Sequence, residues 1–147
     1  MRVSDIMTPN LVCCAADSAT LQAARLMCDN DVGAIPVVDA QQRPVGILTD
    51  RDITCRGVAA DRDARTILVR EIMSKPVVSV TAETDVDAAC ETMERHQLRR
   101  VLVVDENGGV AGIVALADIA RHASRKETAE VVKEVSRPTH RAVGASL

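Results

Sequence analysis

Thr49 and Asp52 form a T-x-x-D pattern at the predicted start of a helix, and their types and spacing suit two kinds of chemistry. A hydroxyl beside free N–H groups at a helix start suits a phosphate, and a short carboxylate can accept ribose hydroxyls. The same spacing is close to a capping box, in which each side chain accepts a hydrogen bond from the other residue's backbone N–H. On spacing alone, the capping role is favoured.

Arg99 and Arg100 stand side by side before an apolar run, in QLRRVLVVD. Arg suits phosphate because its guanidinium forms paired hydrogen bonds with the phosphate oxygens. At the start of a strand the two side chains would point in opposite directions, so we expect one of them to reach a given ligand. The alternative for each is a solvated charge at a strand end.

The cysteines and histidines do not indicate a metal or redox site. The five cysteines are odd in number and form no C-x-x-C pair, and the three histidines have no ligand spacing with them. In a reducing cytosol we expect the cysteines to be small, buried hydrophobic residues. Adjacent cysteines on a strand point to opposite faces, which does not suit a shared metal. We therefore predict no metal and no covalently bound cofactor. The residues concerned are Cys13, Cys14, Cys28, Cys55, Cys90, His96, His122 and His140.

Composition excludes several other functions. The sequence has no Phe, Tyr or Trp, so bases cannot stack on aromatic platforms. Its net charge is −3, so the chain as a whole has no excess of basic residues that would favour binding to nucleic acid. A P-loop, a nucleophile elbow and an H-E-x-x-H motif are absent from the sequence, so we predict a protein that is not an enzyme. Without an apolar membrane span or signal run, we expect a cytoplasmic protein that does not bind membranes.

Two copies of one unit must position these side chains. At an offset of 66 residues, the segment 3–53 matches 69–119 with 14 identities. Each copy predicts a short opening helix, a strand, a helix, a hairpin of two strands and a last helix. In the first copy, Asp17 or Ser18 caps the long helix and Gly33 ends it. We expect the first copy's strands at 11–14, 35–39 and 45–48, and the second copy's at 77–80, 101–105 and 110–114.

The sequence resembles a tandem pair of cystathionine β-synthase (CBS) domains, a Bateman module. The resemblance rests on the V-x-x-I-M-[TS] openings, the PVVD and LVVD strands, and the segments GILTDRD and GIVALAD. It implies an α+β fold of two pseudo-symmetric β-α-β-β-α repeats packed sheet to sheet, followed by a C-terminal helix. We predict repeat 1 at 1–61, a linker at 62–68, repeat 2 at 69–123, and a helix with a loose tail at 124–147.

The resemblance also implies a ligand site that combines one repeat's [ST]-x-x-D motif with the other repeat's strands. In the family such a site binds an adenosine-containing ligand. Thr49 and Asp52 would then face Arg99 and Arg100, which meet the phosphate. The base would lie beside four apolar residues, Val77, Val78, Ile47 and Leu48, although Ile47 also reads as ordinary core.

The second site departs from the family pattern. Asp118 is present, but Ala115 replaces the Thr, and Gly33 and Ala34 replace the arginines. We expect this site, with Asp118, Val12 and Ile35, to be degraded.

The tail after the repeats is compatible with a helix that carries Ala129, Val132 and Val135 close to one face and stops at Pro138. This helix covers either its own module or a second subunit, and the resemblance implies a homodimer. Basic residues in the tail are diluted by acidic ones, so we predict no nucleic-acid partner.

We therefore expect a regulatory module that senses AMP, ADP or ATP. The alternative is a structural interaction protein whose ligand sites have decayed.

Overall fold

The computed structural model describes residues 1–122 and 124–138, so the predicted loose tail beyond Pro138 lies outside the described residues. Within the described part, no helix is long and apolar enough to cross a membrane. The first half contains α1 (Val3–Ile6), β1 (Thr8–Pro9), β2 (Cys14–Ala15), α2 (Thr20–Asn30), β3 (Ala34–Val38), β4 (Pro44–Thr49), α3 (Asp50–Asp52) and the π-helical turn η1 (Ile53–Val58). The second half contains α4 (Val69–Ile72), β5 (Ser79–Thr81), α5 (Val86–His96), β6 (Arg100–Val104), β7 (Val110–Ala115), α6 (Leu116–His122) and α7 (Arg125–Val135).

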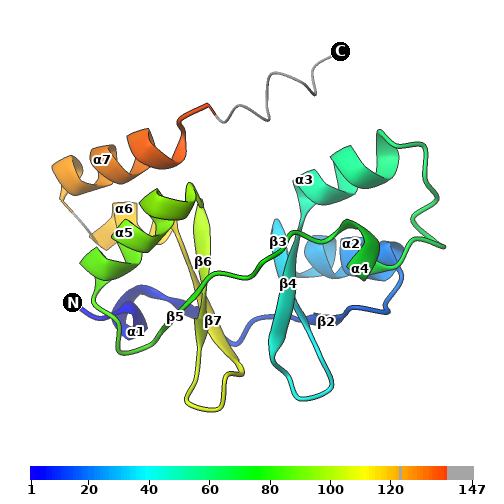
Figure 1. The fold of residues 1–147 in the computed structure, drawn as a ribbon, viewed down its shortest axis with the longest axis horizontal. Helices are drawn as coiled ribbons and strands as arrows, with labels where there is room; N and C mark the ends of the chain where they lie inside the picture. Colours follow the sequence, from blue (N-terminus) through cyan, green and yellow to red (C-terminus); the bar gives the residue numbers. More distant parts are fainter. Residues whose placement is uncertain (123, 139–147) are drawn as a thin grey trace.

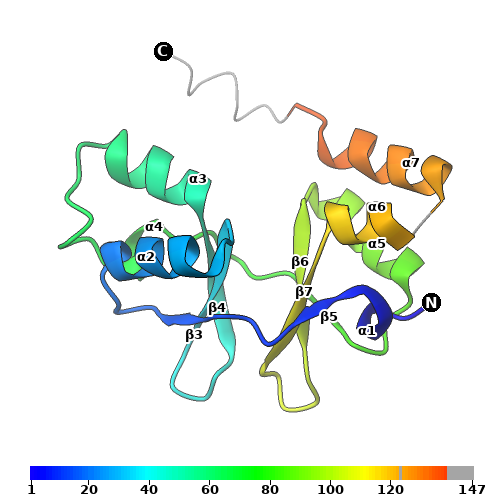
Figure 2. The ribbon, with the colours of Figure 1, turned by 180° about the vertical axis from the view of Figure 1, so that it is seen from behind.

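The strands form two mixed sheets, with orders β2-β3-β4 and β1-β7-β6-β5. The pairs β2/β3 and β5/β6 are parallel, whereas the hairpins β3/β4 and β6/β7 and the pair β1/β7 are antiparallel. The sheets stand side by side across the middle of the molecule, with α2 and α4 outside one and α1 and α5 outside the other (Figures 1 and 2). The predicted α+β fold of two repeats with a C-terminal helix is confirmed.

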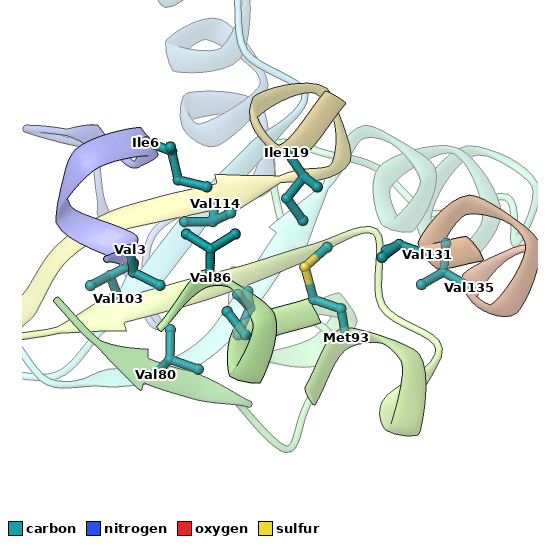
Figure 3. Packing of buried hydrophobic residues seen from close by; sticks show 12 residues of the cluster. Val3, Ile6, Val80, Val86, Met93, Val103, Val114, Ile119, Val131 and Val135 are labelled. Carbon is teal, nitrogen blue, oxygen red and sulfur yellow. The ribbon is translucent and has the colours of Figure 1, made fainter. Parts of the chain in front are cut away.

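The opening segments are exchanged between the two halves. Val3 and Ile6 of α1 are buried in the hydrophobic core of the second repeat, as Figure 3 shows. Val69 and Ile72 of α4 are buried in the core of the first repeat. Because each opening helix completes the other half's core, neither sheet carries a complete apolar core on its own.

The exchange explains the shared V-x-x-I-M and G-I motifs. Met7 lies on Gly112, where an added Cβ would stand 2.9 Å from the Met7 sulfur. Met73 lies on Gly46, where a Cβ would stand 2.5 Å from the Met73 sulfur. Glycine is therefore required at both positions for the methionine of the opposite repeat to pack on the hairpin strand.

The ends of α2 differ from the prediction. Ala19, not Asp17 or Ser18, is the N-cap, and no side chain caps the helix. Asp31 ends it in the left-handed conformation, with φ 52°, so Gly33 lies outside the helix. The buried face of the helix carries Thr20, Ala23 and Met27.

The cysteines are only partly buried. Cys14 is buried and Cys13 and Cys90 are half-buried, but Cys28 and Cys55 are exposed, which corrects the expectation of five buried thiols. Burial and the neighbouring Cys13 raise the pKa of Cys14 to about 11, and burial also raises the pKa of Cys13. Both thiols therefore stay protonated at neutral pH, which does not favour a redox role.

The C-terminal helix α7 packs on its own chain, against α5 and α6. Its buried side chains are Val131 and Val135, one turn apart, and both belong to the core of the second repeat. Ala129 and Val132 are exposed, so the predicted apolar face is correct only for Val135. The helix ends at Val135, before Pro138, as the sequence predicts.

Candidate functional site

Thr49 and Asp52 form a complete capping box at the start of α3. The Asp52 backbone N–H donates to Thr49 Oγ1 at 3.1 Å, and the Thr49 backbone N–H donates to Asp52 Oδ2 at 3.0 Å. The capping interpretation of this spacing is confirmed. It also holds the Thr49 side chain in one orientation at the end of β4.

Asp52 has two further partners. Ser74 Oγ lies 2.9 Å and 3.1 Å from the two carboxylate oxygens and donates to them. The Arg56 guanidinium lies 3.9 Å from Oδ1 and donates to the backbone carbonyls of Ile72 and Met73. Asp52 is 7% exposed, so its charge is held by hydrogen bonds inside the protein. The carboxylate thus links α3 to the segment that follows α4.

A cavity of about 620 Å³ lies between the two halves, beside this carboxylate. The repeats contribute Thr49 and Ile47 from one side and Val77, Val78, Arg99 and Arg100 from the other. Leu48 and Asp52 do not line the cavity. Leu48 is fully buried in the core of the first repeat, and Asp52 stands behind Thr49 and Ser74. The lining residues are Ile47, Thr49, Asp50, Arg51, Ser74, Pro76, Val77, Val78, Gln97, Leu98, Arg99, Arg100, Val135, Ser136, Arg137 and Pro138.

The turn from α5 into β6 positions the arginines. Gln97 takes the left-handed conformation at the end of α5, with φ 52°, and directs the chain back towards the sheet. The Arg99 carbonyl accepts a hydrogen bond from the Leu116 N–H, and Arg100 pairs with Ala115 across the sheet. Arg99 is exposed and Arg100 is half-buried, and both residues line the same cavity.

The cavity carries a positive charge. In the part of the chain that the structure describes, Arg51, Arg99 and Arg100 form no ion pair. Asp50 is the one carboxylate among the lining residues. Three unneutralised guanidinium groups beside a Thr hydroxyl favour an anionic ligand with several oxygen atoms.

The corresponding position in the other repeat is different. Asp118 accepts from the Ala115 N–H at 2.8 Å and from the Arg121 guanidinium at 2.6 Å, so an ion pair already holds its carboxylate. Ala115 supplies no hydroxyl. Ile35 is fully buried in the core, and Val12 is half-buried.

Comparison with known families assigns the fold. The family model described as the CBS domain matches residues 3–56 and 69–125. The chain belongs to the CBS domain family.

Two curated CBS relatives match this chain over most of their length. The CBS domain-containing protein YhcV of Bacillus subtilis is 41% identical over 127 residues, which is 86% of this chain and 89% of YhcV. Hypoxic response protein 1 of Mycobacterium tuberculosis is 36% identical over 134 residues, which is 91% of this chain and 93% of that protein. This chain is therefore similar to proteins that consist largely of a CBS pair.

Solved CBS structures include proteins with bound adenosine compounds. A CBS domain protein from Pyrobaculum aerophilum complexed with AMP is 27% identical, with a TM-score of 0.76 over 90% of this chain and 99% of that one. The CBS domain pair of protein MJ0100, in complex with 5′-methylthioadenosine and S-adenosyl-L-methionine, is 27% identical, with a TM-score of 0.74 over 82% and 94%. A cyanobacterial CBS-CP12 protein, 29% identical with a TM-score of 0.76 over 86% and 73%, is hexameric.

One relative holds a metal. A crystal structure of Hypoxic Response Protein I contains two coordinated zinc ions, and it covers 84% of this chain at a TM-score of 0.76. Among the residues described here, no three His, Cys, Asp or Glu side chains gather in a group that could hold a metal ion.

Several residues of the cavity were not among those predicted from the sequence. Ser74 ends the opening motif of the second CBS repeat, and its hydroxyl could have been recognised from the shared [TS] position. Asp50 and Arg51 lie inside the T-x-x-D motif itself. The end of α7 carried no such signal, because its place over the cavity depends on how α7 packs against α5.

Proposed function

We propose that this CBS pair is a non-catalytic regulatory module that binds an adenine nucleotide of the AMP, ADP or ATP class in the cavity between its repeats. The observation that carries the proposal is the cavity where Thr49, Arg99 and Arg100 meet. Similarity to CBS proteins complexed with AMP or S-adenosyl-L-methionine supports an adenosine compound. The guanidinium groups favour one that carries phosphate.

The proposed ligand uses the polar and apolar parts of the cavity separately. Its phosphate lies against Thr49 and one or both arginines, because within the described residues none of these side chains donates a hydrogen bond. Its base lies against Val77, Val78 and Ile47, which are half-buried and apolar. Without aromatic residues, the base is held by aliphatic contacts and by backbone hydrogen bonds.

In this proposal, Asp52 contacts the ribose only when a ribose hydroxyl replaces the hydroxyl of Ser74 as its hydrogen-bond donor. Its carboxylate is the acceptor for Ser74 Oγ, and Ser74 lines the cavity. A ribose hydroxyl can replace the Ser74 hydroxyl as donor at nearly equal energy, because one neutral hydroxyl replaces another. The same geometry supports a second candidate, an interaction protein with decayed sites, since the carboxylates of both repeats are already bonded within the chain.

Regulation requires that the ligand favour one conformation or association state over another. CBS relatives form oligomers, and one is hexameric. We propose that this chain forms a homodimer and that nucleotide binding biases that contact. Static light scattering of the protein with and without nucleotide measures both the dimer and its response, and a ligand-independent monomer would contradict this part of the proposal.

Differential scanning calorimetry tests the ligand class. A ligand at 100 times its Kd stabilises the folded state by about 2.7 kcal/mol. For a chain of this size that raises Tm by roughly 8 °C. We expect this shift with AMP, ADP or ATP.

Removing either of the arginines proposed to bind phosphate should reduce the increase in Tm that the nucleotide causes. A charge-assisted hydrogen bond contributes about 1.5–3 kcal/mol, so Arg99→Ala or Arg100→Ala is expected to reduce affinity by a factor of roughly 10 to 100. Arg95→Ala, on the exposed side of α5, is the matched control. No shift in the unmodified protein with any nucleotide would favour the interaction protein instead.

A further inference from the structure

The C-terminal helix α7 is held firmly over the second CBS repeat. Val131 and Val135 are 3% and 6% exposed and pack into the same core as Met93 of α5. Figure 3 shows these two valines beside Met93, and Figure 1 shows α7 running over α5 and α6. The position of the residues just after Val135 therefore follows from the packing of the core.

The end of α7 forms one wall of the cavity that we propose for the nucleotide. Val135, Ser136, Arg137 and Pro138 all line it. The Ser136 and Arg137 N–H groups donate to carbonyls of the last helical turn, at 3.1 Å and 3.3 Å, so a hydrogen-bonded turn fixes the segment between the helix and the arginine. This wall lies outside the two segments that the CBS model matches.

Arg137 borders the cavity from the end of α7 rather than from a repeat. Its side chain is 60% exposed, and Arg99 is exposed as well, whereas Arg100 is half-buried at the start of β6. Arg137 therefore lies where the cavity opens to solvent. It also has a partner, because its guanidinium pairs with Glu134 at 2.7 Å.

We propose that α7 is part of the ligand site, and that Arg137 binds a phosphate beyond the first, so that the site takes an adenosine di- or triphosphate in preference to a monophosphate. This inference rests on the proposed function. The inner phosphate binds Arg99, Arg100 and Thr49. The outer phosphate reaches the exposed guanidinium of Arg137.

Glu134 competes with this phosphate for Arg137. The carboxylate must give up its ion pair when the guanidinium turns to the ligand, and its own charge repels the phosphate. Glu134 also lies near other acidic residues, since burial and the charges of Glu130, Glu134 and Glu91 raise the pKa of Glu94. Removing the charge of Glu134 should therefore strengthen binding of the longer phosphate chain.

Isothermal titration with AMP, ADP and ATP, without divalent cations, tests this assignment. Arg137→Ala is expected to lower the affinity for ADP and ATP at least 10-fold and the affinity for AMP less than 3-fold. Arg125→Ala, at the other end of α7 and outside the cavity lining, is the matched control and should change none of the three. Glu134→Gln is expected to raise the affinity for ADP and ATP at least 2-fold. Far-UV circular dichroism verifies that each variant keeps its helices.

The outcomes separate this inference from the proposed function. If the unmodified protein binds a nucleotide but Arg137→Ala behaves like Arg125→Ala, α7 is not part of the site, while the nucleotide module stands. If Arg137→Ala weakens AMP as strongly as ATP, the assignment to an outer phosphate is overturned. If the unmodified protein binds none of the three, the proposed function and this inference both fail.

Discussion

At the scale of single residues, Asp52 and Asp118 occupy equivalent positions but have different surroundings. Both accept a backbone N–H of the residue three positions earlier. Asp52 adds the Ser74 hydroxyl at 2.9 Å and lies 3.9 Å from the Arg56 guanidinium, whereas Asp118 adds Arg121 at 2.6 Å. The neutral Ser74 hydroxyl can be exchanged for a ligand hydroxyl, while the close Arg121 ion pair is harder to displace. The asymmetry between the repeats therefore depends on these partners as well as on the missing Thr.

Replacing each aspartate separates the capping role from the binding role. Both Asp52→Ala and Asp118→Ala are expected to reduce the free energy of unfolding by about 0.5–2 kcal/mol, because each removes the acceptor for a backbone N–H at the start of a helix. Only Asp52→Ala should also abolish nucleotide binding. Urea unfolding without ligand measures the first effect and calorimetric titration the second. Equal losses of affinity in the two variants would contradict the asymmetry of the sites.

Part of the site could be predicted from residue types alone. The T-x-x-D motif and the two arginines were recognisable because their chemistry is explicit in their side chains. The burial of Leu48 and Ile35 in the core could not be predicted, because strand alternation gives two faces without saying which one is core. The place of Arg137 beside the cavity could not be predicted either, since it depends on the docking of α7.

At the scale of elements, the exchanged opening helices hold the two halves together. The contacts between Met73 and Gly46 and between Met7 and Gly112 join each opening segment to the hairpin of the other repeat. The paired bridge between Ile47 and Ser74 continues this contact towards the cavity. The duplicated sequence predicted the strands and helices, but not this exchange, because a repeat pattern does not say which copy an opening segment packs against.

Gly46→Ala should disturb this junction. The new Cβ would stand 2.5 Å from the Met73 sulfur and 3.2 Å from the Ser74 carbonyl oxygen, which is part of the backbone and cannot rotate away. We expect a loss of about 1–3 kcal/mol in the free energy of unfolding, as for other overpacked sites.

Gly57→Ala is the matched control for that loss. Its Cβ would meet only Ile67, at 3.8 Å, which is ordinary van der Waals contact. Its effect should be within about 1 kcal/mol and of either sign. Urea unfolding of both variants makes the comparison, and an equal loss would contradict the close contact at Gly46.

The docking of α7 should respond to pH through Glu94. Burial and the neighbouring carboxylates raise its pKa above the ordinary value of a glutamate. The folded state thus binds this proton more tightly than the unfolded state, so the charged form disfavours folding above the raised pKa, and the penalty is relieved as the pH falls through it.

Glu94→Gln should therefore be more stable than the unmodified protein at pH 7, and this difference should shrink as the pH falls through the raised pKa. Urea unfolding across that range measures the difference, with Glu106→Gln in the exposed hairpin turn as the control. A gap between Glu94→Gln and the unmodified protein that is independent of pH would show that the raised pKa has no effect on stability.

At the scale of the whole molecule, the cavity breaks the pseudo-symmetry of the CBS pair. Thr49, the end of α7 and three arginines of the repeats, which form no ion pair within the described residues, surround that cavity. The equivalent position in the other half lacks the hydroxyl and the arginines. The pseudo-symmetric fold could be predicted from the repeat. The proposed asymmetry in binding follows from a few substitutions at equivalent positions, together with the tail that follows only the second half.

Isothermal titration calorimetry of the full chain with AMP, ADP and ATP tests the central claim most directly. The account predicts saturable binding of one nucleotide per chain. Two equivalent sites per chain, or no heat from any of the three nucleotides at two temperatures, would contradict it.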